Sequence, residues 1–261
     1  MAKLSVKAIQ KTKNVSKLTM ITAYDYLFAK LFNETADIIL VGDSLNMSFG
    51  GQKDTLNASL DVMLYHTNAV CKGAPDTFVV CDMPFGSYTD DAKALESAIR
   101  VYQETSADAV KIEGGVAKAD IIRTITGNGI AVMGHIGLLP QFFRSEGYAV
   151  KGKAEGDTDR LIADAKAVEA AGAFAIVIEG VKADVAKAIT EAVSIPTIGI
   201  GAGKDTDGQV LVWSDMLGFF EDFKPKFVRQ YLDGASLVKE AVKKYDADVK
   251  SGEFPNESES Y

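Results

Sequence analysis

The sequence predicts a (β/α)8 TIM barrel. Short apolar runs recur about eight times, and segments with the period of amphipathic helices lie between them. The chain has 261 residues, and this fold typically needs about 250. Alternation of strands and helices favours parallel strands joined by right-handed crossovers. A doubly wound open sheet is the alternative, but the glycine fingerprint that would follow its first strand is missing.

The predicted strands are short runs dominated by apolar residues. They are residues 18–23, 38–44, 78–84, 109–114, 131–137, 174–180, 196–203 and 210–218. Apolar stripes with helical spacing occur at 27–32, 60–70, 95–102, 161–168 and 185–189. No linker divides the chain. We therefore expect a single barrel domain over residues 1–261, with a short, polar and frayed tail at 252–261.

Composition narrows the classes of function. Apolar residues make up 47% of the chain and charged residues 25%, which is typical of a globular protein. The net charge of −8 argues against a nucleic-acid surface. No apolar run approaches the roughly 18 residues of a membrane span, and the first residues lack a signal-peptide pattern. Cys71 and Cys81 match no zinc or redox spacing. We expect a cytoplasmic enzyme or partner-binding domain, with neither nucleic acid nor membrane as partner.

Four acidic residues stand at or just inside the carboxyl ends of predicted strands. They are Asp43, Asp82, Glu113 and Glu179. In a barrel these ends open on one face, where active sites are built from several strands. Independent helix caps would explain single acids, but four acids in one dry mouth need a cation or raised pKa values. Asp43, Asp82 and Glu113 on three successive strands predict a divalent metal, and oxygen ligands favour Mg²⁺ over zinc.

Basic residues share this predicted rim. Lys111 lies two residues before Glu113, so both side chains point to the same side of the strand. Lys111 either forms a plain salt bridge or holds a substrate carboxylate or developing oxyanion. His135, on the fifth predicted strand, is either a structural histidine or part of the site. His66 falls within a helical stripe and is expected to be structural.

Two long segments leave alternatives open. The glycine-dense residues 198–209 either form a phosphate-binding nest or allow close packing, although neither GxGxxG nor a Walker pattern occurs there. Residues 138–157 are much longer than the usual βα loop of about 2–6 residues. They form either an ordered surface excursion or a lid that excludes water or meets a second substrate.

Together these motifs resemble the ketopantoate hydroxymethyltransferase family. The matching stretches run in order along most of the chain. They are TAYDYLFAKLF, ILVGDSLNM, YHTNAV, DMPFGSY, VKIEGG, GHIGLLPQ, GYAVKGK and IPTIGIGAGKDTDGQVLVWSDMLG. The resemblance implies a (β/α)8 barrel, Mg²⁺, 5,10-methylenetetrahydrofolate as hydroxymethyl donor and 3-methyl-2-oxobutanoate (α-ketoisovalerate) as acceptor. It also implies a homo-oligomer, a decamer. The apolar stripe at 237–245 would serve that assembly or cover the barrel.

The resemblance also implies a role for each rim residue. The metal ligands would be Asp43, Asp82 and Glu113, the last bound directly or through water. The substrate contacts would be Asp43, Ser44, Asp82, Lys111 and His135. Glu179 would be the catalytic general base.

The implied reaction yields 2-dehydropantoate (ketopantoate), in pantothenate and coenzyme A biosynthesis, through a Mg²⁺-stabilised enolate. A 2-oxo acid can chelate the ion, which polarises the carbonyl and stabilises the enolate. One rival is a Mg²⁺ barrel of the phosphoenolpyruvate mutase and isocitrate lyase type, but Cys71 and Cys81 lack the Lys and His setting of its loop cysteine. The other is a catalytically silent binding protein, which the complete set of rim residues disfavours.

Overall fold

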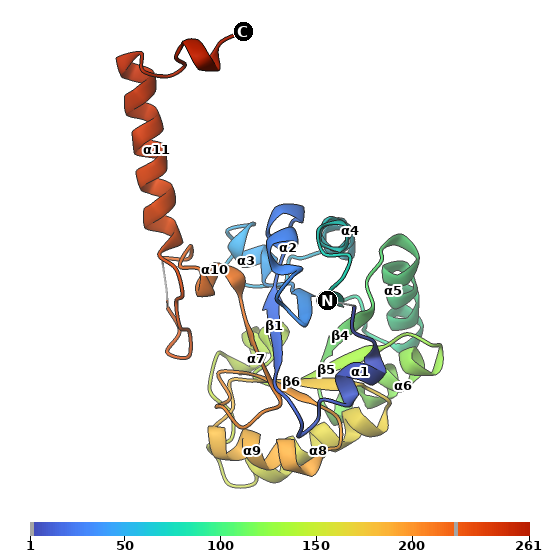
Figure 1. The fold of residues 1–261 in the computed structure, drawn as a ribbon. Helices are drawn as coiled ribbons and strands as arrows, with labels where there is room; N and C mark the ends of the chain where they lie inside the picture. Colours follow the sequence, from blue (N-terminus) through green and yellow to red (C-terminus); the bar gives the residue numbers. More distant parts are fainter. Residues whose placement is uncertain (1–2, 222–223) are drawn as a thin grey trace. The chain divides into compact units, whose positions relative to one another are not determined.

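The computed structural model describes residues 3–221 and 224–261 and contains a closed barrel of eight parallel strands in sequence order (Figure 1). The strands are β1 Leu18–Thr22, β2 Ile38–Val41, β3 Phe78–Asp82, β4 Ala109–Glu113, β5 Val132–Gly137, β6 Ala175–Glu179, β7 Thr197–Ile200 and β8 Gly208–Leu211. Parallel pairing of β8 with β1 closes the barrel. The predicted (β/α)8 class is confirmed.

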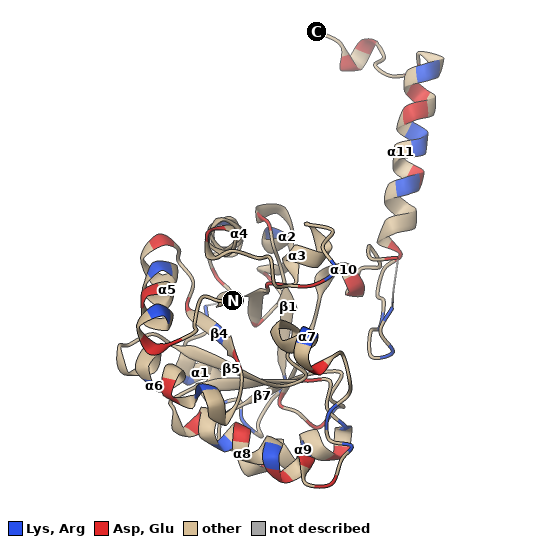
Figure 2. Cartoon of the chain, turned by 180° about the vertical axis from the view of Figure 1, so that it is seen from behind, with Lys and Arg blue, Asp and Glu red and all other residues tan. Residues whose placement is uncertain are grey.

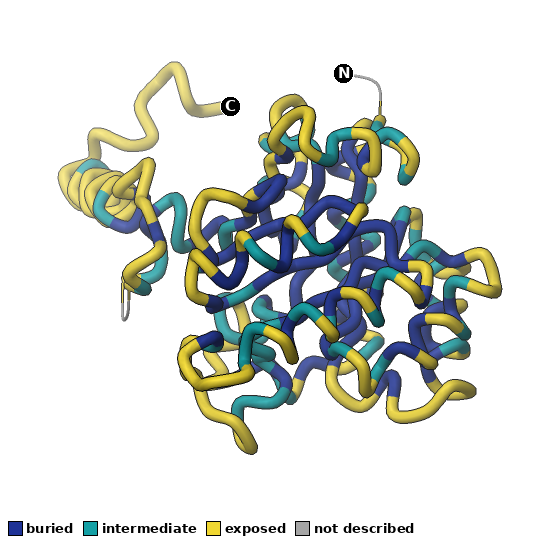
Figure 3. The backbone as a smooth tube through the Cα atoms, turned by 90° about the horizontal axis from the view of Figure 1, so that it is seen from below, coloured by how far each residue is buried: buried dark blue, intermediate teal, exposed yellow. Residues whose placement is uncertain are grey.

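Helices cover the outside of the barrel. The longer ones are α2 Tyr26–Phe32, α4 Leu60–Gly73, α5 Asp91–Glu104, α6 Ala119–Gly127, α8 Asp157–Ala170 and α9 Ala183–Ala192. Shorter pieces are α1 Val6–Gln10, α3 Leu45–Ser48, η1 Val116–Lys118, η2 Pro140–Phe142 and α7 Phe143–Glu146. In α4 the buried residues include Met63, Leu64 and Val70, which form one helical stripe. Figure 3 shows the result, with buried strands inside and exposed residues on the outer faces of the helices.

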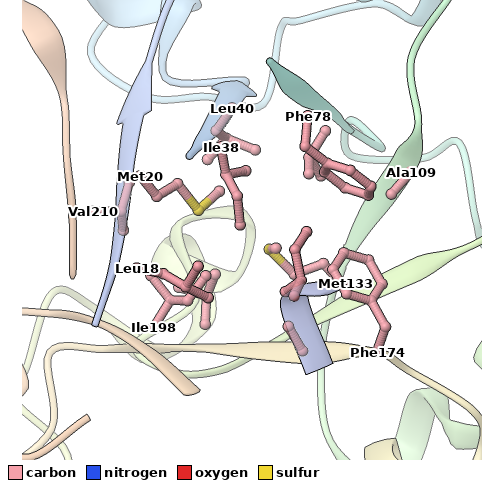
Figure 4. Packing of buried hydrophobic residues seen from close by; sticks show 14 of the residues in the cluster. Leu18, Met20, Ile38, Leu40, Phe78, Ala109, Met133, Phe174, Ile198 and Val210 are labelled. Atoms are coloured by element: carbon pink, nitrogen blue, oxygen red, sulfur yellow. The ribbon is translucent and has the colours of Figure 1, made fainter. Parts of the chain in front are cut away.

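The interior of the barrel is a packed apolar core. Alternate residues of each strand point inward, for example Leu18 and Met20 of β1. Figure 4 shows these side chains converging from opposite strands. The rings of Phe78 and Phe174 meet edge to face with centroids 5.5 Å apart, and Ile9 of α1 is fully buried in the same cluster. Because the strands are covered on both faces, their sequences read as continuous apolar runs.

The structure differs from the sequence-based prediction at one strand and at one helix. The eighth strand was expected at 210–218, but β8 is Gly208–Leu211 and a helical turn, α10 Trp213–Met216, follows. The expected strand is wrong because a short apolar run has the same pattern in a buried strand and in a buried helical turn. Helix α6 lies at 119–127, where the sequence reading singled out no stripe.

The glycine-dense segment joins β7 to β8 without a helix between them. A Cβ atom on Gly199 would lie 2.7 Å from Thr206 Oγ1, and one on Gly208 would lie 2.7 Å from the Leu18 carbonyl oxygen. Both distances are shorter than real Cβ contacts allow. These two glycines therefore permit close packing of a short crossover, which is the second of the two alternatives for residues 198–209.

The chain forms two compact units, Met1–Val212 with the barrel and Trp213–Tyr261. The second unit contains α10, α11 Gly234–Ser251 and η3 Glu257–Glu259. Figure 2 shows charged residues of both signs along α11, where Lys244 pairs with Asp248 four residues later. A single domain over residues 1–261 stays a prediction. In residues 3–221 and 224–261, every helix is too short or too polar to cross a bilayer.

Asp207 ties three segments together at the amino end of the barrel. Its Oδ2 atom accepts hydrogen bonds from the Thr197 backbone N–H (2.9 Å), the Thr197 hydroxyl (3.0 Å) and Lys13 Nζ (2.9 Å). Its Oδ1 atom accepts one from the Asn14 N–H at 3.2 Å. Burial opposes ionisation of Asp207, but the bonds from Thr197 and Lys13 outweigh it and lower the pKa. The ionised carboxylate therefore stabilises the fold.

We predict that Asp207→Asn lowers the free energy of unfolding at pH 7 by about 2–4 kcal/mol, because it removes the charge that compensates buried Lys13. A carboxyl group whose pKa is lowered by folding stabilises the folded state at pH values above its ordinary pKa near 4. This stabilisation is lost as the pH falls through the pKa of the folded state. The difference from the parent should therefore shrink below about pH 4. Urea unfolding at several pH values measures it, with exposed Asp205→Asn as control. Equal stabilities at pH 7 would contradict the prediction.

Candidate active site

The strand registers bring the predicted site residues together at the carboxyl end of the barrel. Asp82 of β3 lies beside Lys111 of β4, and Glu113 lies beside His135 of β5. Gly137 of β5 is the register partner of Glu179, the last residue of β6. Asp43 and Ser44 follow β2 after one residue, Gly42. Residues separated by up to 136 positions in sequence thus form one cluster of polar side chains above the apolar core.

The two aspartates are in direct contact. The Asp43 backbone N–H donates to Asp82 Oδ2 at 3.0 Å, and Asp82 Oδ1 lies 2.7 Å from Lys111 Nζ. Burial, together with the charges of Asp82 and Glu113, raises the pKa of Asp43 well above its usual range. Burial also raises the pKa of Asp82, although Lys111 opposes the shift. Ionised, this pair has more negative charge than one lysine compensates.

A glycine allows the close approach of these groups. A Cβ atom on Gly42 would lie 2.8 Å from Ser44 Oγ and 3.5 Å from Asp82 Oδ2. Ser44 Oγ is also 2.7 Å from the hydroxyl of Tyr24, whose side chain is fully buried. Beside it, His66 Nδ1 lies 2.5 Å from the Tyr24 carbonyl oxygen. This contact agrees with the structural role expected for His66.

His135 lies between a lysine and two glutamates. Lys111 Nζ is 3.1 Å from its Nδ1, Glu113 Oε1 is 3.6 Å from Nδ1, and Glu179 Oε2 is 3.2 Å from Nε2. Burial and Lys111 favour the neutral ring, but Glu113 and Glu179 outweigh them and raise the pKa of His135 to about 9. The Nε2–H group faces Glu179 both in the charged ring and in the neutral tautomer that accepts from Lys111.

Glu113 and Glu179 differ in their surroundings. Glu113 is 1% exposed; burial opposes its ionisation, but His135, Lys111 and the Gln141 N–H outweigh burial and lower its pKa. The side chain of Glu179 is 22% exposed and lies at the edge of the cluster. Glu113 is thus enclosed as an anion, whereas Glu179 is open to an incoming molecule.

Gln141 belongs to the site but is not among the residues predicted from the sequence. This residue of η2 is buried, and its Nε2 donates to Asp43 Oδ2 at 2.8 Å and to the Met83 carbonyl oxygen at 3.0 Å. Its backbone N–H donates to Glu113 Oε2 at 3.0 Å, and its Oε1 accepts from the Tyr88 hydroxyl at 2.5 Å. A glutamine in a long loop has no periodicity, so nothing in one sequence marks it as buried.

The rest of the long connection lies beside the acids. The rings of Phe143 and Tyr148 stack with centroids 5.1 Å apart. Arg144 Nη2 lies 3.1 Å from Asp54 Oδ2, which ties α7 to the loop after α3. Burial and then the charges of Asp54 and Glu179 raise the pKa of Tyr148. The segment is ordered against the rim; opening and closing as a lid stays a prediction.

The acidic side chains at the rim could ligate a metal ion only in part. Within residues 3–221 and 224–261, no three His, Cys, Asp or Glu side chains are arranged to ligate one ion together. Asp43 and Asp82 are adjacent, whereas Glu113 is held by His135 and Gln141. Mg²⁺ is commonly bound through one or two carboxylates and keeps several waters. The excess negative charge of the two aspartates fits such an ion.

Comparison with known proteins identifies the family. A sequence model of ketopantoate hydroxymethyltransferase matches residues 3–257. The chain belongs to this family. The 3-methyl-2-oxobutanoate hydroxymethyltransferase of Aliarcobacter butzleri (strain RM4018) is 65% identical over 260 residues, covering 99% of this chain and 97% of the relative. The protein of the same name from Helicobacter pylori (strain Shi470) is 58% identical, covering 99% and 96%. Membership confirms the resemblance and makes the chain a hydroxymethyltransferase, so the silent binding protein is excluded.

Solved structures share the barrel at low identity. Phosphonopyruvate hydrolase, solved with oxalate and Mg²⁺, has a TM-score of 0.64 at 12% identity, covering 98% of this chain and 93% of its own. A 2,3-dimethylmalate lyase of the phosphoenolpyruvate mutase and isocitrate lyase superfamily has a TM-score of 0.59 at 14% identity, covering 96% and 88%. These likenesses show the fold alone.

We predict that Asp43→Asn stabilises the ketopantoate hydroxymethyltransferase chain in EDTA. A raised folded-state pKa means that ionised Asp43 costs stability once the pH exceeds its ordinary value near 4, and Asn removes the charge while keeping the shape. The gain should be about 1–2 kcal/mol, or roughly 2–4 °C in Tm per kcal/mol. Thermal unfolding at pH 7.5 measures it, with Asp205→Asn as control. A lower Tm for Asp43→Asn would show that the charge stabilises the fold.

Proposed function

We propose that this enzyme transfers a hydroxymethyl group from 5,10-methylenetetrahydrofolate to 3-methyl-2-oxobutanoate, giving 2-dehydropantoate. The family and its named relatives support the acceptor. The observation that carries the mechanism is the contrast between two parts of one rim. Asp43, Asp82 and Lys111 form a buried cluster of charged groups, and Glu179 lies at the more exposed edge of the site.

The proposed cofactor is Mg²⁺, held by Asp43 and Asp82, with Glu113 contributing through water. When bound, this ion would neutralise the aspartates and act as a Lewis acid toward the keto and carboxylate oxygens of a 2-oxo acid. The pKa values of Asp43 and Asp82, raised by burial and by neighbouring carboxylates, support the assignment, because a bound cation would favour the ionised carboxylates and so oppose both shifts.

Lys111, Ser44 and His135 are proposed to hold the keto acid. Lys111 Nζ already contacts Asp82, and burial tends to neutralise it, but Asp82 and Glu113 raise its pKa and keep it charged. Its position between Asp82 and His135 suits an anionic oxygen of the substrate. Ser44 Oγ, already in contact with the Tyr24 hydroxyl, offers a further polar group beside Asp43.

Glu179 is the proposed general base. One of its carboxylate oxygens accepts the proton from C3 of the keto acid, and the electron pair of that C–H bond passes to the enolate. His135 Nε2 lies 3.2 Å from Glu179 Oε2, and the charged ring would hold this carboxylate at the rim as an ion pair. The enolate carbon then forms a bond to the methylene carbon of the folate as one of the two C–N bonds of that carbon breaks, and the electron pair of the broken bond passes to the nitrogen. Water then replaces the second nitrogen in hydrolysis of the adduct, which supplies the hydroxyl oxygen of the product and releases tetrahydrofolate.

Self-association as a decamer, implied by the family resemblance, belongs to the same proposal. The apolar residues at 237–245 lie in α11. Their use in such an assembly is supported only by their pattern along that helix.

We predict that the enzyme, with Mg²⁺ and without folate, exchanges the C3 proton of 3-methyl-2-oxobutanoate for deuterium in heavy water. Glu179→Gln should slow this exchange by roughly 10²–10⁴-fold, because the amide keeps the size of the side chain but cannot accept the proton. Proton NMR of the keto acid measures the rate. Glu191→Gln, an exposed change on α9, is the matched control and should exchange like the parent.

Two outcomes would overturn parts of this function. Parent-like exchange by Glu179→Gln would remove the base assignment and leave the metal assignment intact. No exchange by the parent, with keto acid and Mg²⁺ shown to bind by calorimetry, would overturn folate-independent enolisation.

A further inference from the structure

Every polar group of the Gln141 side chain forms a hydrogen bond inside the site. The two N–H donors of its amide reach Asp43 Oδ2 and the Met83 carbonyl oxygen. Its amide oxygen accepts from the Tyr88 hydroxyl. The side chain is 4% exposed, so water cannot readily replace these partners. A buried amide with full hydrogen bonding is held in one orientation.

The Met83 carbonyl oxygen and the Asp43 carboxylate decide which way the amide points, because both accept hydrogen bonds and so require the amide nitrogen. The opposite orientation would place two oxygens, Oε1 and the Met83 carbonyl oxygen, against each other. It would also put Oε1 against the Asp43 carboxylate. The Tyr88 hydroxyl donates to Oε1 on the other side of the amide and stabilises the same orientation.

Gln141 also reaches a second carboxylate through its backbone. Its N–H donates to Glu113 Oε2 at 3.0 Å, while its side chain occupies Asp43 Oδ2 at 2.8 Å. These acids come from β4 and from the segment after β2, and Gln141 comes from the connection after β5. One residue therefore donates to one oxygen of each acid, and Asp43 Oδ1 is the carboxylate oxygen that Gln141 does not contact.

We propose that Gln141 is a positioning residue that holds Asp43 for binding a divalent cation through a single oxygen, with Tyr88 stabilising the orientation of its amide. The proposal rests on the proposed function, because the cation is the one assigned there to Asp43 and Asp82. Residues that hydrogen-bond to a metal-binding carboxylate orient it, and their loss commonly costs about 10–100-fold in metal affinity.

The local geometry favours positioning over simple packing. An apolar side chain of similar size would fill the same volume, but it would leave Asp43 Oδ2 and the Met83 carbonyl oxygen without their donor. The freed carboxylate could rotate toward Lys111 or bind the ion with both oxygens. Loss of these bonds also lowers the stability of the cation-free protein, so cation affinity is the measurement that separates positioning from packing.

The test compares Gln141→Met and Tyr88→Phe with the parent, using Mn²⁺ as a paramagnetic probe of the cation site. Titration followed by electron paramagnetic resonance gives the Mn²⁺ dissociation constant, and competition gives that of Mg²⁺. We expect Gln141→Met to weaken both by about 10–100-fold. Tyr88→Phe keeps the glutamine but removes one of the hydrogen bonds that stabilise its orientation, so a smaller, several-fold loss is expected. Gln103→Met on α5, exposed, is the matched control.

The outcomes separate this proposal from the function on which it rests. Parent-like affinity in Gln141→Met overturns the positioning role while leaving the metal site intact. If Gln141→Met does not fold, Tyr88→Phe decides, and parent-like affinity there overturns the proposal. A parent that binds no Mn²⁺ or Mg²⁺, alone or with keto acid, overturns the metal assignment and this proposal together.

Discussion

The rest of the site depends on one electrostatic constraint, the burial of several carboxylates at one end of an apolar barrel. Asp43, Asp82 and Glu113 are each 1–3% exposed, and Lys111 contacts Asp82. Removing carboxylates from water is expensive unless charges and hydrogen bonds compensate them. His135 and Gln141 compensate Glu113, whereas burial still raises the pKa values of the aspartates. A site with this excess of negative charge is suited to bind a cation, together with an anionic ligand that contacts the same cation.

The barrel makes such a site possible because the unfavourable burial of carboxylates is confined to one end of it. Below the acids, inward side chains such as Met20, Ile38 and Met133 form a continuous apolar core. At the opposite, amino end, Asp207 is ionised and fully hydrogen-bonded, so a buried carboxylate there stabilises the fold. Asp207 and Asp43 thus have opposite effects on stability. Asp207 accepts hydrogen bonds from Thr197 and Lys13, whereas Asp43 lies beside further acids.

Side chains from outside the strands complete the site. Gln141 and Tyr148 come from the long connection after β5, and Tyr88 comes from the loop after β3. These loops carry the contacts that orient the acids, while the strands carry the acids themselves. This division is expected of a barrel, in which rigid strand ends present reactive groups and loops adjust them.

The sequence by itself determined the fold class, seven of the strands and the residue set at the rim. It could do so because buried parallel strands are continuous apolar runs, and a polar residue at the end of such a run must lie at the barrel mouth. Only the tertiary structure decided that Gly208–Leu211 is the eighth strand, that the glycines before it serve packing, and that Gln141 joins Asp43 to Glu113. Each of these facts depends on contacts between segments far apart in the chain. Local periodicity contains no information about such contacts.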